Sequence, residues 1–171
     1  MTEPHFLICA PARTDVPGLL NMIRALAEFE KLTHLCTAEE ADLEKALFGP
    51  RPAAEALIAW RNGVAAGFAL FYHTFSTFLG RRSLWLEDLF VMPDFRRLGC
   101  AKALLKSLAV LAVERGCGRF EWAVLDWNDR AIGFYRTLGA DVMPDWRIVR
   151  LTGPALRAFA ETPSESPRLG H

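Results

Sequence analysis

Two neighbouring carboxylates, Glu87 and Asp88, interrupt an apolar stretch that runs from Leu84 to Met92. The stretch predicts a strand, and Pro93 ends it because proline has no N–H to donate to a ladder. A charge inside a buried strand is costly, so a carboxylate placed there is a candidate for proton chemistry. Glu87 is our candidate general base, acting directly or through a water. A carboxylate held by a salt bridge is the alternative explanation.

A short basic turn follows this strand, and a helix follows the turn. Apolar residues recur at helical spacing from Ala101 to Ala112, which predicts a helix with one face on a sheet. The first N–H groups of a helix lack internal partners and lie at the positive end of its dipole, where phosphate oxygens bind. A solvated basic turn is the alternative. The candidate phosphate-binding residues are Arg96, Arg97, Leu98, Gly99, Cys100, Ala101 and Lys102.

This turn resembles the pyrophosphate-binding signature of the GNAT superfamily of acyl-CoA-dependent N-acetyltransferases, Arg/Gln-x-x-Gly-x-Gly/Ala. The matching residues are Arg96, Gly99 and Ala101. Within the superfamily, the chain is similar to the diamine (spermidine/spermine) and thialysine N-acetyltransferase group. The resemblance extends over Leu86–Met92, Asp126–Asn128 and Gly133–Tyr135, and more weakly over Leu26–Glu30 and Trp146–Arg147. The order of the elements predicts an α/β or mixed α+β fold, and the resemblance implies the GNAT fold, with a central mixed, mostly antiparallel twisted sheet and helices on both faces.

The resemblance also implies acetyl-CoA as co-substrate, without a metal, and it assigns roles to residues. An alkylammonium with a pKa near about 10.4 must lose a proton before it attacks a thioester. The family's proposed base matches Glu87, and its general acid for the departing sulfur matches Tyr135. The amide of Asn128 would hold the pantetheine arm. Backbone groups of Leu89, Phe90 and Val91 would pair with that arm and polarise the thioester carbonyl.

For the acceptor, the resemblance implies a small molecule with a primary amine, either a diamine or polyamine or a lysine-like compound. The expected substrate-binding residues are Phe29, Glu30, Glu87 and Asp88. Two positions depart from the family pattern. Phe29 replaces a tyrosine and so lacks one hydroxyl, and Arg97 replaces a glycine common in the phosphate turn. The sequence therefore leaves the identity of the amine open.

Length and composition bound the class of protein. A chain of 171 residues with 51% hydrophobic residues supports one core, so we expect a single domain over 1–161 and a flexible Pro/Ser-rich tail over 162–171. The sequence has no long apolar run, so we expect no membrane span. Equal numbers of basic and acidic residues, 20 of each, argue against a nucleic-acid partner. The first ten residues lack a secretory pattern, so we expect a cytoplasmic protein.

The four cysteines, Cys9, Cys36, Cys100 and Cys117, have no spacing typical of a zinc site. We expect free thiols. A helix N-terminus beside arginines should lower the pKa of the Cys100 thiol, so a covalent acyl-enzyme through Cys100 is a minor hypothesis. Its alternative role is that of a small residue in a tight turn.

Other elements follow from periodicity and turn residues. Strands are predicted over 6–10, 54–61, 64–73, 119–125, 142–144 and 146–151, and a loop over 74–82. Asn62-Gly63 predicts a hairpin turn. In the loop over 74–82, Phe75 and Phe78 either line an entrance or pack beneath that entrance. Helices are predicted from Thr14 or Asp15 to Lys31, from a capping box at Thr37-x-x-Glu40 to Gly49, from Asn128 or Asp129 to Gly139, and from Gly153.

These observations support an N-acetyltransferase that works through a direct ternary complex. A CoA-binding sensor or structural protein on the same fold is the alternative, because fold does not imply function. By resemblance, and because the apolar final strands could pair between subunits, we also expect a homodimer.

Overall fold

The computed structural model describes residues 5–162. Its contacts divide the chain into two compact units, one up to Ala123 and one from Val124 onward. The single domain expected over 1–161 stays a prediction. The expected tail, apart from Thr162, lies outside the described residues.

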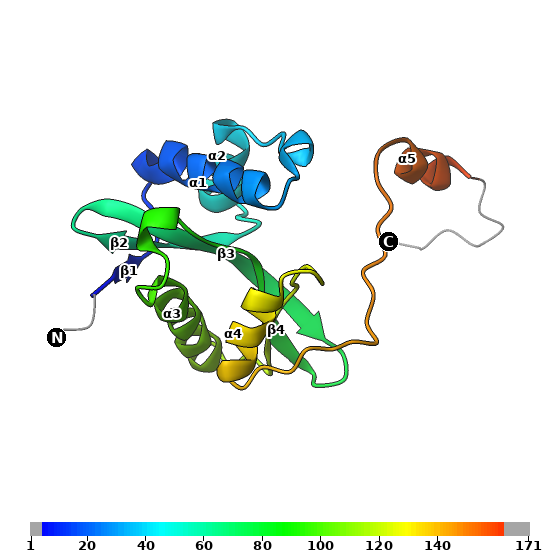
Figure 1. Ribbon diagram of the computed structural model, residues 1–171. Helices are drawn as coiled ribbons and strands as arrows, with labels where there is room; N and C mark the ends of the chain where they lie inside the picture. The colour runs from blue at the N-terminus through cyan, green and yellow to red at the C-terminus, as the bar shows by residue number, and fades with distance from the viewer. Residues whose placement is uncertain (1–4, 163–171) are drawn as a thin grey trace. The chain divides into compact units, whose positions relative to one another are not determined.

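The first unit is built on a mixed sheet with the strand order β1-β2-β3-β4-β5 (Figure 1). Neighbouring strands are antiparallel, except that β4 and β5 are parallel. The mostly antiparallel mixed sheet is therefore confirmed. The strands are β1 (Leu7–Cys9), β2 (Glu55–Arg61), β3 (Val64–Ser76), β4 (Arg81–Val91) and β5 (Phe120–Trp122).

The hairpin between β2 and β3 turns at Asn62 and Gly63, whose φ angles of 51° and 76° are those of a tight left-handed turn. The next connection is shorter than predicted. Strand β3 continues to Ser76 and β4 begins at Arg81, so much of the predicted loop over 74–82 is paired strand. At its tip Phe78 is fully exposed, and it does not pack beneath the sheet.

Helices cover both faces of this sheet, as predicted. In Figure 1, α1 (Val16–Phe29) and α2 (Glu40–Phe48) lie on one face and α3 (Cys100–Glu114) lies on the other. The first face carries a core in which side chains of α1 pack with Ile58, Phe68 and Phe90. These three residues form one row across β2, β3 and β4. Each fully buried large apolar side chain contributes about 1.5–3 kcal/mol, so this row anchors the central strands.

One predicted helix start is wrong. The N-cap of α2 is Glu39, whose backbone N–H donates to Oδ2 of Asp42 at 3.0 Å. The predicted capping box at Thr37-x-x-Glu40 does not form, because Thr37 precedes the cap by two residues and lies outside regular structure. Asp42, three residues after the cap, performs the function expected of Glu40.

Strand β4 contains an irregularity at the predicted catalytic position. Leu70 of β3 lies opposite Asp88, but Phe71 lies opposite Leu86, so Glu87 is an extra residue in β4. Such a β-bulge bends a strand and redirects its side chains. The pairing with β5 ends at Leu86, opposite Trp122, whereas β4 continues to Val91. The stretch from Glu87 to Val91 thus extends beyond the parallel ladder.

The second unit contains α4 (Asp129–Thr137) and α5 (Gly153–Glu161), both close to their predicted positions. The strands predicted over 142–144 and 146–151 are wrong, because no residue between 123 and 162 is in a strand. Their apolar side chains are exposed; Trp146 retains 78% of its surface and Val149 retains 94%. An apolar stretch needs a strand edge to pair with, and this one has none within the described unit.

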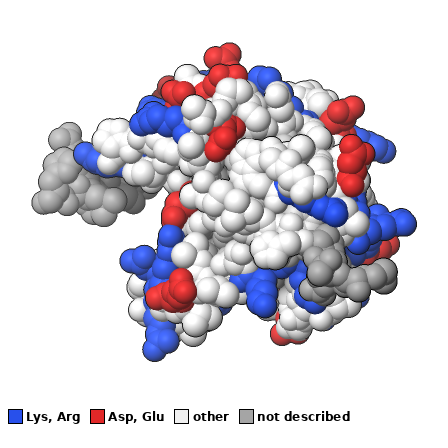
Figure 2. Space-filling view, turned by 90° about the vertical axis from the view of Figure 1, so that its left-hand side faces the viewer, with Lys and Arg blue, Asp and Glu red and all other residues white. Residues whose placement is uncertain are grey.

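Charges of both signs are mixed on the face drawn in Figure 2, where they surround an uncharged area. This mixture agrees with the equal counts of basic and acidic residues. No helix within residues 5–162 has the length and apolar character needed to cross a membrane.

Candidate active site

Three carboxylates gather where β4 bends and α1 ends. Glu87 and Asp88 are consecutive in β4, and Glu30 directly follows α1. The charges of Glu87 and Glu30 both act on the Asp88 carboxyl. Within residues 5–162, none of the three makes a salt bridge with Lys, Arg or His. The salt-bridge explanation for Glu87 therefore does not hold, and this end of the first unit presents uncompensated negative charge.

The Glu87 carboxylate is held by two aromatic side chains that the sequence analysis did not identify. The Tyr72 hydroxyl donates to Oε2 of Glu87 at 3.1 Å, and Nε1 of Trp85 donates to the same oxygen at 3.0 Å. Tyr72 and Trp85 are directly opposite each other on β3 and β4. The Leu-Trp-Leu-Glu pattern places Trp85 two residues before Glu87, which is the one sequence signal that could have indicated this contact.

The environment of Asp88 differs from that of Glu87. Burial, the neighbouring Glu87 charge and then Glu30 raise the pKa of the Asp88 carboxyl from 3.8 to about 6. Burial also raises the pKa of Glu30. A nearby cation stabilises the ionised form of carboxylates in such surroundings, because it offsets both their lost hydration and their mutual repulsion. This group of side chains is suited to bind an ammonium ion.

The basic turn leads into α3 as predicted. Arg97 and Gly99 both have left-handed backbones, with φ of 64° and 84°, and α3 begins at Cys100. A Cβ on Gly99 would meet no atom within 4 Å, so glycine is favoured there by its φ and not by lack of space. At the start of α3 the Ala103 N–H donates to the Gly99 carbonyl at 2.9 Å. The preceding N–H groups are those that a pyrophosphate would accept from, so the turn fits the predicted cofactor.

Arg96 connects this turn to the acidic group. Its Nε donates to the Val91 carbonyl at 3.1 Å, and its guanidinium lies 5.1 Å from the Phe29 ring centre and 5.5 Å from that of Phe90. Cation–π contacts of this kind contribute about 0.5–1 kcal/mol at exposed sites. Phe29, which precedes Glu30, therefore packs against the start of the phosphate turn.

The expectation of a lowered pKa at Cys100 is wrong. Cys100 is 2% exposed, and this burial raises the pKa of its thiol to about 11. Its sulfur lies 3.4 Å from the position that a Cβ on Gly67 would occupy. Cys100 is thus a packed, protonated thiol, and the helix dipole does not overcome its loss of hydration.

Asn128 and Tyr135 belong to the second unit. The Asn128 side-chain oxygen caps α4 by accepting from the Ala131 N–H at 3.2 Å. The NH₂ group of the same amide is not used in this cap. The Tyr135 ring lies 5.6 Å from that of Phe134, and burial raises the pKa of its phenol. Tyr135 is therefore a neutral O–H donor at physiological pH.

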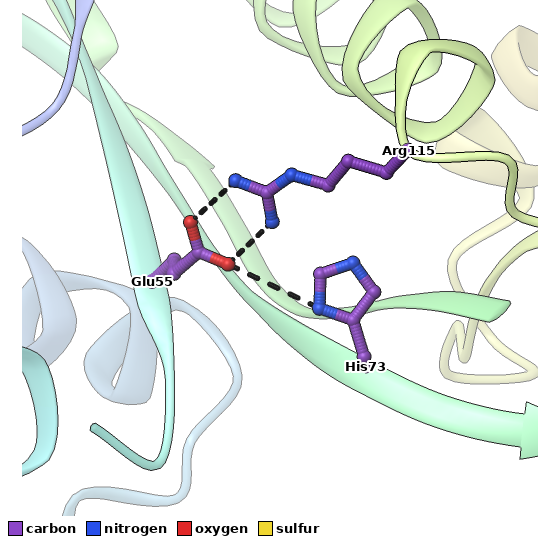
Figure 3. Close-up of polar contacts among 3 residues, drawn as sticks. All are labelled: Glu55, His73 and Arg115. Carbon is purple, nitrogen blue, oxygen red and sulfur yellow. Dashed lines mark hydrogen bonds and ion pairs between the residues drawn. The ribbon is translucent and has the colours of Figure 1, made fainter. Parts of the chain in front are cut away.

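A separate polar cluster joins β2, β3 and the end of α3 (Figure 3). Arg115 donates two hydrogen bonds to Glu55, at 2.5 and 2.7 Å, and Nδ1 of His73 lies 4.0 Å from the same carboxylate. The Arg115 contact lowers the pKa of Glu55, and burial lowers the pKa of His73. The forked pairing ties α3 to the sheet that it covers.

No three His, Cys, Asp or Glu side chains within the described chain are grouped to hold a metal ion.

The mixed sheet with helices on both faces fits an acyltransferase of the GNAT class, and the sequence comparison shows that class. The Acetyltransferase (GNAT) family model matches residues 21–140, and the chain belongs to this family. It is an N-acetyltransferase, and family membership implies acetyl-CoA as the acetyl donor.

Several characterised relatives are similar over most of their length. A thialysine N-epsilon-acetyltransferase of Caenorhabditis elegans is 40% identical, with 92% of this chain and 98% of the relative covered. The mouse (Mus musculus) enzyme of the same name is 36% identical, covering 86% and 92%. The L-ornithine N5-acetyltransferase NATA1 of Arabidopsis thaliana is 34% identical, covering 85% and 84%.

Solved structures share the fold. An integron cassette protein from the mobile metagenome of V. cholerae superposes with a TM-score of 0.77 at 24% identity, covering 92% of this chain and 98% of that one. The aminoglycoside acetyltransferase meta-AAC0020, from an uncultured soil sample, gives a TM-score of 0.72 at 19% identity, covering 86% and 97%.

Proposed function

We propose that this enzyme acetylates a primary amine of a small molecule that carries a second positive group or lies near lysine in size. The observation that carries the proposal is the group formed by Glu30, Glu87 and Asp88, which makes no salt bridge within the described residues. The names of the relatives, which act on thialysine and L-ornithine, support the same substrate class. Diamines and polyamines also carry a primary amine and a second positive group, so they are alternative candidates for the acceptor.

In the proposed mechanism, Glu87 takes a proton from the ammonium of the acceptor, directly or through one water. The N–H bond breaks, its electron pair stays on nitrogen, and the carboxylate oxygen gains the proton. The neutral amine then attacks the thioester carbonyl in a direct ternary complex. Asp88 and Glu30 hold the positive charge of the acceptor in place, and Phe29 borders the group through its contact with Arg96.

Residues beyond the acidic group act on the donor. Backbone groups from Leu89 to Val91 lie past the end of the β5 pairing, so the proposal has them bind the pantetheine arm and polarise the carbonyl. The turn from Arg96 to Lys102 binds the pyrophosphate, and the amide NH₂ of Asn128 binds the arm. After the C–N bond forms, the C–S bond breaks and Tyr135 donates its phenolic proton to the departing sulfur. The proton that the new amide nitrogen loses then returns to the Tyr135 phenolate, directly or through water. These roles follow the family pattern at matching positions.

The test measures release of the CoA thiol from acetyl-CoA in the presence of thialysine, L-ornithine, L-lysine, spermidine or short diamines, with a control lacking amine. Release that depends on one of these amines supports the proposal and names the acceptor. Glu87→Gln should then lose most of the amine-dependent rate while acetyl-CoA still binds. Saturable CoA binding without acetylation of any of these amines would contradict the proposed substrate class.

We also propose that two copies of the chain form a homodimer. Support comes from the stretch 142–151, where Trp146, Ile148 and Val149 are 71% to 94% exposed although all three are large apolar residues. Contiguous apolar surface of this kind marks an interaction site. Sedimentation velocity over a wide concentration range should give a dimer, and Ile148→Asp with Val149→Asp should shift it to monomer. A wild-type monomer at every concentration would refute the dimer.

A further inference from the structure

Two aromatic side chains converge on a single oxygen of Glu87. Tyr72 and Trp85 form a cross-strand pair on β3 and β4, and their hydroxyl and indole N–H donate to Oε2 at 3.1 and 3.0 Å. A donor-only indole and a phenol that remains protonated are suited to this task. Burial and the adjacent Glu87 charge raise the pKa of Tyr72, so its O–H persists at working pH.

The β-bulge brings Asp88 to the same side of the sheet as Glu87 and its two donors. In a regular strand, Trp85 and Glu87 would be on one face and Asp88 on the other, because successive side chains alternate. With Glu87 as the extra residue, Asp88 lies opposite Leu70, which faces the α1 and α2 core, and Tyr72 follows Leu70 on the same face. The two donors and both carboxylates therefore share one side of the sheet.

We propose that Tyr72 and Trp85 are positioning residues for amine acetylation, which hold Oε2 of Glu87 so that Oε1 is directed to the acceptor nitrogen. The inference rests on the proposed role of Glu87 as proton acceptor. An exposed glutamate otherwise samples several rotamers, and two hydrogen bonds to one oxygen restrict it to a single orientation.

A positioning role differs from a purely structural one in what it predicts. Tyr72 and Trp85 are only half buried and lie outside the buried core cluster. Their polar atoms should therefore matter more to Glu87 than to folding. Removing either donor should lower turnover only while Glu87 is present to be positioned.

The experiment compares Tyr72→Phe, Trp85→Phe and the double variant with wild type, each in the Glu87 and the Glu87→Gln background. Trp60→Phe on β2 is the matched control, because it removes an indole N–H away from Glu87. Each single change should lower kcat with the amine about five- to thirtyfold, from the loss of a charge-assisted hydrogen bond at a partly exposed site. The KM for acetyl-CoA should stay within about twofold, a margin typical of a change that spares cofactor contacts.

A further comparison separates positioning from general damage. In the Glu87→Gln background, neither aromatic change should reduce the residual rate further. If circular dichroism shows that Trp85→Phe does not fold, the near-isosteric Tyr72→Phe is compared alone in the Glu87 and Glu87→Gln backgrounds.

The inference is overturned if the aromatic variants match wild type in kcat, or if they lose as much activity in the Glu87→Gln background. Failure of the proposed function looks different. In that case wild type shows no amine-dependent thiol release, or Glu87→Gln turns over as fast as wild type.

Discussion

Replacing Asp88 with asparagine should stabilise this protein at pH 8. The pKa of Asp88 rises from 3.8 to about 6 in the folded state, chiefly through burial and then through Glu87 and Glu30. The folded state thus binds the proton more tightly than the unfolded chain does. Above pH 6 the folded protein carries an unfavourable charge, and below pH 3.8 both states are protonated and the penalty disappears.

The magnitude follows from the same two values. Each tenfold change in acid constant is worth about 1.4 kcal/mol, so keeping Asp88 ionised costs about 3 kcal/mol at pH 8. An asparagine amide also loses hydration on burial, so about half of this, roughly 1.5 kcal/mol, should appear as stabilisation. For a chain of this length that corresponds to an increase in Tm of about 3–6 °C.

The assay is guanidinium unfolding of wild type and Asp88→Asn at pH 8 and pH 4. The gain should be present at pH 8 and should become a loss of roughly 1 kcal/mol at pH 4, where most of the charge penalty has gone and the cost of burying the amide remains. Asp94→Asn is the matched control, because Asp94 is exposed just after β4 and should show no such difference. An equal gain at both pH values would attribute the effect to packing, and a loss of stability at pH 8 would refute the electrostatic reasoning. The stabilised variant should bind the amine more weakly, as a binding site built on repulsion predicts.

Three further predictions concern other parts of the chain. Tyr135→Phe should lower turnover about a hundredfold with CoA affinity nearly intact, since it removes only a proton donor; an unchanged rate would exclude Tyr135 from the mechanism. Cys100→Ala should retain activity within about threefold, because its thiol is protonated; inactivity together with a trapped acetylcysteine in wild type would revive the acyl-enzyme. Glu55→Gln should destabilise by about 1 kcal/mol at neutral pH. Since Arg115 lowers the pKa of Glu55, this difference should fade as pH falls below 4.5, and a constant difference down to pH 3 would contradict the ion pair.

Local signals in the sequence predicted most of the first unit. Apolar residues at helical spacing identified α1 and α3, because each needs one continuous face against the sheet. Asn62-Gly63 identified the hairpin because few other dipeptides adopt two left-handed conformations in succession. The signature at the start of α3 and the stretches on either side of it indicated the family by their resemblance to its motifs.

The features that were missed depend on contacts between distant residues. The alternation in 142–151 predicts strand, but a strand forms only beside a partner edge, which the sequence of one chain does not supply. No local pattern indicates the bulge at Glu87. The two-residue spacing places Trp85 near Glu87, but the hydrogen bond from Tyr72 depends on the pairing of β3 with β4 and could not be predicted. For Cys100, burial outweighed the helix dipole, and burial is a property of the packed sheet.

The bulge also means that the proposed catalytic residue is not one of the residues that pair β3 with β4. With Leu70 opposite Asp88 and Phe71 opposite Leu86, the two strands would pair without interruption if residue 87 were removed. A chain shortened by that one residue has every pair that the ladder requires, and it lacks only the carboxylate proposed to accept the proton. Catalysis here would then depend on an insertion that the sheet does not need for its own pairing. Gain or loss of activity would be possible by adding or deleting one codon, with the surrounding fold retained.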